Sequence, residues 1–127
     1  MSNSLVQQAI RYAKGLPNPN SATVAVAQVD GQTIVGVNGN AGSDNIGALW
    51  SMTDSQGATL VVGQGDIPHL HAEGAVYDNV SEADRQDLKI GISNSNGPCN
   101  QGCNPYFLQE QQLTGVNVYW PERYWTR

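Results

Sequence analysis

The sequence predicts a single α/β domain over residues 1–127, with the element order α-β-β-α-β-α-β. The chain has 127 residues, which is a usual length for one domain and leaves little room for a second core. Hydrophobic residues make up 39% of the chain, enough to bury a core. Segments with the helical period of about 3.6 residues alternate with segments that have the strand period of about two. No internal repeat or low-complexity segment interrupts this order.

The first helix is expected over residues 4–14. Leu5 and Ile10 fall on one face of this segment, and the polar residues between them fall on the other. Gly15 and Pro17 follow directly and are typical residues after a helix end.

A hairpin is expected next, with strands over residues 22–29 and 33–37. An Asp-Gly pair separates these two β-rich segments and is a strong hairpin signal. The region 38–66 is rich in Gly, Ser and Asn, and it is predicted to be a long loop with one short strand at residues 59–62.

Two more helices and two more strands complete the predicted order. The second helix is expected over residues 69–80, directly after Pro68, and the third over residues 104–113. Buried-strand patterns follow each helix, at residues 88–92 and 116–120, and the chain then ends in an aromatic tail.

The charge balance limits the classes of partner. Six Lys and Arg residues against eleven Asp and Glu give a net charge of -5, which excludes a polybasic protein that binds nucleic acid through counterion release. Nucleic acid would have to be contacted locally. No apolar run approaches the roughly 18 residues that span a bilayer, so no membrane association is expected. The first residues show no signal peptide.

The residues that carry chemistry lie at the predicted starts of the second and third helices. His71 and Glu73 are separated by one residue, and Pro98 precedes Cys99, with Cys103 four positions further on. One imidazole and two thiolates are an accepted ligand set for a catalytic Zn²⁺ with water in the fourth position. Glu73 is not needed as a ligand and is the candidate proton carrier beside that water.

Other interpretations of these residues remain open. His69 is a rival ligand to His71, two positions away and pointing differently on a helix. The cysteines could form a local disulfide, or the zinc could be structural with a fourth protein ligand. In those cases Glu73 is an ordinary acid in the first turn of a helix.

This constellation resembles the zinc-dependent cytidine deaminase-like superfamily, whose signature is H-x-E…P-C-x-x-C. The His-Ala-Glu-Gly and Gly-Pro-Cys segments look most like the deaminase domains of bacterial polymorphic toxins. The resemblance covers nearly the whole chain and implies a three-layer α/β/α sandwich. The chain departs from the pattern in two ways: three residues separate Cys99 from Cys103, and the chain is expected to end after the fourth strand. A left-handed backbone conformation at Gly102 would accommodate the one additional residue between the two cysteines.

The resemblance implies a hydrolase that converts cytosine to uracil. His71, Cys99 and Cys103 would bind Zn²⁺, which lowers the pKa of its water, and Glu73 would carry protons to the ring and to the departing amine. DNA is the favoured substrate, single-stranded or with a flipped base. The alternatives are a free nucleoside or nucleotide substrate, which the acidic charge favours, and a non-catalytic zinc-stabilised binding module.

The resemblance also implies partners and substrate contacts. A toxin domain of this type would act as a monomeric effector delivered to a target-cell cytoplasm, and an immunity protein would cover its pocket. Trp50 is expected in the core or as a lid that stacks on a base. Two interpretations stay open for Arg123 and the aromatic residues near the C-terminus, Trp120, Tyr124 and Trp125: they bind nucleic acid, or they cover the edge of the core. The candidate substrate-binding residues are Asn38, Asn40, Ser93, Asn94, Asn96, Pro98, Trp50 and Arg123.

Overall fold

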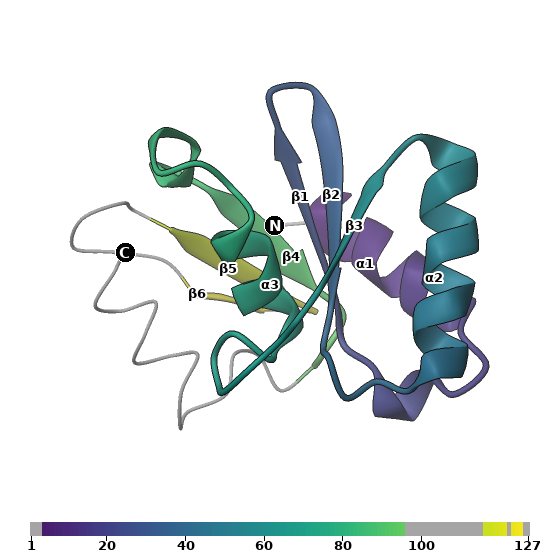
Figure 1. Cartoon of the computed structure of the whole chain (residues 1–127). Coiled ribbons are helices and arrows are strands. Elements are labelled where there is room, and N and C mark those ends of the chain that lie inside the picture. The colour runs from purple at the N-terminus through teal and green to yellow at the C-terminus, as the bar shows by residue number, and fades with distance from the viewer. Residues whose placement is uncertain (1–3, 96–115, 122, 126–127) are drawn as a thin grey trace.

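The computed structural model describes residues 4–95, 116–121 and 123–125 and confirms the α/β class (Figure 1). The helices are α1 (Ser4–Lys14), α2 (Ser43–Gln56) and α3 (Ala72–Asp78), with short 3-10 turns η1 (Pro19–Ser21) and η2 (Ala83–Arg85). The strands are β1 (Val24–Val29), β2 (Gln32–Val37), β3 (Thr59–Val62), β4 (Lys89–Ile92), β5 (Asn117–Trp120) and β6 (Arg123–Trp125). None of the helices described has the length and apolar character required to cross a membrane.

The strands form one mixed sheet in the order β3-β2-β1-β4-β5-β6. β2 is parallel to β3 and β4 is parallel to β5, while β1 is antiparallel to both β2 and β4. Strands β2, β3, β4 and β5 therefore run in the same direction, and their carboxyl ends meet at one edge, together with the start of β1. We call this edge the carboxyl edge and the opposite one the amino edge. In open α/β sheets, ligands bind outside the carboxyl ends of the strands.

Helices cover both faces of the sheet (Figure 1). In β1, Val24 and Val26 belong to a buried cluster with α1 and α2, whereas Ala25 and Ala27 belong to a second cluster with α3. This alternation follows from the strand period, because successive side chains point to opposite faces. The domain consequently has a core on each side of the sheet.

Small residues let the helices approach the sheet closely. A Cβ atom on Gly36 of β2 would lie 2.5 Å from the carbonyl oxygen of Ala72 in α3. On the other face, a Cβ atom on Gly91 of β4 would lie 2.4 Å from the backbone nitrogen of Val6 in α1. Because α3 is pressed against the sheet in this way, its first residues are fixed relative to the carboxyl edge.

The prediction of a long loop over residues 38–66 is wrong, because α2 fills much of this region. The side chains of Asn45, Leu49 and Thr53 recur at every fourth position and are all buried. The buried side-chain amide of Asn45 donates a hydrogen bond to the carbonyl of Asn18, and the buried hydroxyl of Thr53 donates one to the carbonyl of Leu49. Polar residues occupy two of these three core-facing positions, so the hydrophobic period of the helix is hidden in the sequence.

The observed bounds of the other elements lie closer to the predicted ones. The first helix and the strands at β1 to β5 are confirmed, with ends shifted by at most two residues. The second predicted helix (69–80) is shorter, because Leu70 and His71 close a turn onto the carbonyls of Asp66 and Pro68 before α3 begins. The aromatic tail contributes the further strand β6, so the expected end after the fourth strand is wrong. The third predicted helix lies outside the described residues.

Candidate functional site

A polar pocket of about 270 Å³ lies at the carboxyl edge, and we call it the carboxyl-edge pocket. Its walls come from the segment before β1, the segment after β2, the start of α3 and the segment after β4. Five residues predicted from the sequence line it together: Asn38, Asn40, His71, Glu73 and Asn94. The topology explains this, since each of them follows a strand that ends at this edge, directly or after a turn.

Glu73 is the buried acid of this pocket. It is the second residue of α3 and is only 3% exposed. Desolvation raises the pKa of its carboxyl group from 4.5 to about 7, although a hydrogen bond from its own backbone N–H opposes the shift. Among the residues that the structure describes, no other group hydrogen-bonds its side chain. A carboxyl group with a pKa near neutrality can both accept and return a proton, as general acid–base catalysis requires.

His71 is the imidazole beside this acid. It occupies the N-cap position of α3 in an extended backbone conformation, without a capping hydrogen bond from its side chain, and it is partly buried. Desolvation lowers the pKa of His71 and so favours the neutral ring, which is the form that coordinates a metal.

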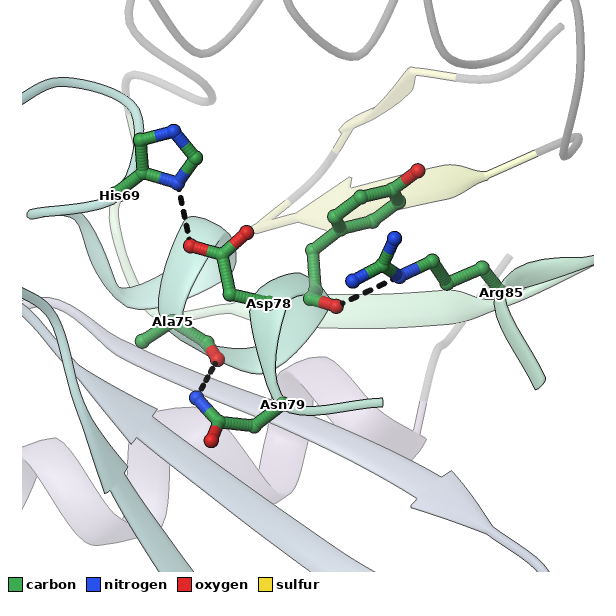
Figure 2. Close-up of polar contacts among 6 residues, drawn as sticks. His69, Ala75, Asp78, Asn79 and Arg85 are labelled. Carbon is green, nitrogen blue, oxygen red and sulfur yellow. Dashed lines mark hydrogen bonds and ion pairs between the residues drawn. The ribbon is translucent and has the colours of Figure 1, made fainter. Parts of the chain in front are cut away.

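His69 points elsewhere. It is exposed, and its Nδ1 atom lies 2.5 Å from Oδ2 of Asp78 (Figure 2). It lines a separate pocket with Leu60 of β3, which does not include Glu73. Of the two histidines, His71 is therefore the one placed beside the buried acid.

The other expected zinc ligands are the two cysteines. Cys99 and Cys103 lie outside the described residues, as do Pro98 and Asn96 from the expected substrate loop. Within residues 4–95, 116–121 and 123–125, no group of three or more His, Cys, Asp or Glu side chains is arranged to hold a metal ion. The described part of the chain supplies one residue of the expected ligand set, His71.

Asn38 organises the wall of the pocket through its side-chain amide. Its Oδ1 atom accepts from the backbone N–H of Thr23 at 2.8 Å. Its Nδ2 atom donates to the carbonyl of Ser21 at 3.2 Å and to Oδ1 of Asn40 at 2.7 Å. Both ends of the Asn38 amide thus hold other parts of the pocket in place, and the exposed Asn40 side chain is better placed to contact a ligand.

Two further candidate residues, Ser93 and Trp50, do not line this pocket. Ser93 accepts from the backbone N–H of Val24 at 3.0 Å and lines a neighbouring pocket, which also contains Asn94. Trp50 lies on α2, is 55% exposed and lines neither pocket. Its assignment to the core is therefore wrong, and its role as a lid that stacks on a base stays a prediction. Arg123 lies in β6, and its side chain is outside the described set.

Close backbone contacts position the start of α3, and the glycines that make them were not predicted from the sequence. A Cβ atom on Gly74 would lie 1.9 Å from the carbonyl oxygen of Pro68, and one on Gly63 would lie 1.9 Å from that of Leu70. The backbone N–H of Gly39 also donates to the carbonyl oxygen of Leu70 at 2.9 Å. The signal available in the sequence was the glycine after each of β2 and β3, since such residues mark close backbone approach.

The far end of α3 is also anchored (Figure 2). Nε of Arg85 donates to the carbonyl of Tyr77 at 3.0 Å, and the guanidinium carbon lies 4.3 Å from the centre of the Tyr77 ring. Asn79 donates to the carbonyl of Ala75 at 2.8 Å. The helix that carries Glu73 is therefore held at both ends, which limits the positions the carboxyl group can take.

Comparisons of the chain with protein-family models, with curated proteins and with solved structures each find no match.

Proposed function

We propose that the protein is a zinc-dependent nucleobase deaminase that converts cytosine to uracil. The observation that carries the proposal is the buried Glu73 carboxyl, which lines a polar pocket beside His71 and has a pKa of about 7. A buried acid without a described charge partner is costly for a fold, and such groups gather at functional sites.

The order of elements supports the finer fold assignment. When α2 and β3 are set aside, the described order is helix, hairpin, helix, strand and then two more strands. These elements follow the expected order, whereas α2 and β3 are additions to it. Helices on both faces of the sheet fit the three-layer sandwich that the resemblance implies.

Zn²⁺ would be held by His71, Cys99 and Cys103, a donor set of imidazole and thiolate that suits this ion. The neutral state favoured for His71 fits that role. When bound with one open position, zinc brings the pKa of a water molecule close to neutrality.

Glu73 would carry the protons of the reaction. It accepts a proton from the attacking water as the new C–O bond forms at the carbon that bears the amine, and it passes this proton to the ring nitrogen. It then moves a second proton, from the added hydroxyl group to the amine. The C–N bond breaks, ammonia leaves and the carbonyl of uracil remains.

A free cytidine or cytidine nucleotide is the second candidate substrate. The pocket is smaller than the roughly 300–1,000 Å³ typical of ligand sites, and the net charge of -5 disfavours a long polyanion. The toxin-type assignment, with DNA as substrate and an immunity protein as partner, is supported by the His-Ala-Glu-Gly and Gly-Pro-Cys segments.

Replacement of the acid tests the proposal. Zinc-containing protein is incubated with cytidine, dCMP and a single-stranded oligonucleotide, and uracil is measured by mass spectrometry. We expect Glu73→Gln to lower turnover on the order of a thousandfold while its zinc content stays normal. Glu82→Gln is the matched control, because Glu82 is exposed in the turn before η2. Normal turnover in Glu73→Gln, or no uracil from any substrate with the unaltered protein, would refute the proposal.

A further inference from the structure

A second, larger pocket adjoins the carboxyl-edge pocket. It measures about 600 Å³, and we call it the adjoining pocket. The two pockets share four lining residues, Asn20, Ala22, Thr23 and Asn94. A ligand whose reacting group sits beside Glu73 can therefore extend past these residues toward the end of α1, where Lys14 lines the adjoining pocket.

Lys14 is the only cationic side chain in the described parts of the chain that lines either pocket. Arg85 is bound to a backbone carbonyl of α3, and Lys89 pairs with a carboxylate at the amino edge. Arg11 lines a different pocket, between α1 and α2. Lys14 is exposed and forms no ion pair with any described residue.

The other groups around Lys14 suit an anion. No Asp or Glu is among the described residues that line the adjoining pocket, although the chain contains eleven. Hydroxyl and amide side chains line it instead, contributed by Thr23, Ser93 and Asn94. Such neutral donors, together with a Lys or Arg, are the groups that proteins use to contact phosphate oxygens.

We propose that the adjoining pocket binds a phosphate group attached to the nucleoside whose base lies beside Glu73, and that Lys14 is the residue that recognises this phosphate. The inference rests on the proposed function and adds the substrate class: a nucleotide rather than a bare nucleoside. The phosphate comes either from a free nucleotide or from the backbone of a strand, and the chemistry recognised is the same.

Lys14 also has a structural role that the test must separate from recognition. It lies in the last turn of α1, where a cation stabilises the helix dipole. Loss of that effect would change stability, but it would not change the preference for phosphate-bearing ligands over cytidine.

Binding to zinc-containing Glu73→Gln protein measures recognition without turnover. In this background, Lys14→Ala and the matched control Lys89→Ala are titrated calorimetrically with cytidine, dCMP and a single-stranded oligonucleotide that contains one dC. We expect the ratio of dCMP or oligonucleotide affinity to cytidine affinity to fall about tenfold in Lys14→Ala and less than about twofold in Lys89→Ala. Lys14→Arg should restore most of the ratio, because it keeps the charge. An effect with the oligonucleotide alone identifies the strand as the source of the phosphate.

The outcomes separate this inference from the proposed function. Equal ratios in the Lys14→Ala and Lys89→Ala variants would overturn it, even if the unaltered protein forms uracil. Lys14-dependent binding of dCMP without uracil formation would support the phosphate site and refute the deaminase proposal. Failure of all three ligands to bind would overturn both.

Discussion

The two edges of the sheet differ in how far their acidic side chains are exposed to solvent. At the amino edge, Asp30, Asp84 and Asp87 line an open groove of about 450 Å³, and the Asp87 side chain is 77% exposed. At the carboxyl edge, the acid that lines the pocket is Glu73, which is 3% exposed, and four asparagines line the same pocket. The groove has the larger volume and the more numerous charges, yet its acids are solvated.

The proposed reactive site therefore differs from the groove in the burial of its acid, and it has fewer acids than the groove. Exposed carboxylates keep the chain acidic and hydrated, and they cost the fold little. Burial of Glu73 raises its pKa to about 7, a value that suits the proton transfer proposed for it. The topology agrees, because the carboxyl ends of four parallel strands meet at the edge that holds Glu73.

The largest expected effect concerns the two histidines. We expect His71→Ala to lower the zinc content from about one per chain to near zero and to abolish activity, since it removes one of the three proposed protein ligands. His69→Ala is the matched control and should keep its zinc, because His69 faces Asp78 and a different pocket. Elemental analysis of protein purified without chelator measures both. Zinc lost from His69→Ala and kept in His71→Ala would reverse the assignment.

A pH titration of stability tests the burial of Glu73. In metal-free protein the folded state holds its proton up to about pH 7, whereas the unfolded chain releases it near pH 4.5. The raised pKa of Glu73 therefore lowers stability as the pH increases from 4.5 to 7, by about 3 kcal/mol in total. Glu73→Gln should escape this loss.

Urea unfolding of both proteins with chelator, between pH 4.5 and about pH 8, gives the comparison. The stability of Glu73→Gln should rise relative to the unaltered protein across this window. Parallel curves would show that Glu73 is not desolvated in the folded state.

Two glycine substitutions test how tightly the start of α3 is packed. Gly74→Ala places a Cβ atom 1.9 Å from the carbonyl oxygen of Pro68, so we expect a loss of about 1–3 kcal/mol. Gly47→Ala in α2 meets nothing within 4 Å and should stabilise the fold by about 0.5–1 kcal/mol. Thermal unfolding of the two variants measures both changes. A neutral Gly74→Ala would mean that α3 is not held against the turn before it.

The smallest effect is expected at the amino edge. Asp87→Asn removes one charge from the groove and keeps an oxygen that can accept from Asn117. Asp87 has φ 57°, a left-handed conformation that Asn also tolerates. Stability should stay within about 0.5 kcal/mol, with turnover unchanged. A marked fall in turnover would mean that the amino edge takes part in function.

The sequence predicted best the parts whose residues follow a simple period. The strands could be recognised from their β-rich alternation. His71 and Glu73 were singled out with Cys99 and Cys103 as a zinc-site pattern, and the structure shows that the two line one pocket. The α2 helix could not, because Asn45 and Thr53 fill buried positions with hydrogen-bonded polar groups. The close contact at Gly74 involves a residue six positions away, and sequence patterns do not encode such distances.

Deep sequencing of mixed DNA and RNA pools, after incubation with zinc-containing protein, tests whether the carboxyl-edge pocket deaminates cytosine. We expect cytosine-to-uracil changes, read as C-to-T, with the unaltered protein and none above background with Glu73→Gln. A parallel cytidine reaction covers the free-nucleoside alternative. Unchanged pools together with unchanged cytidine would contradict the assignment of the carboxyl-edge pocket as a deaminase site, and equal conversion by Glu73→Gln would contradict the role of its buried acid.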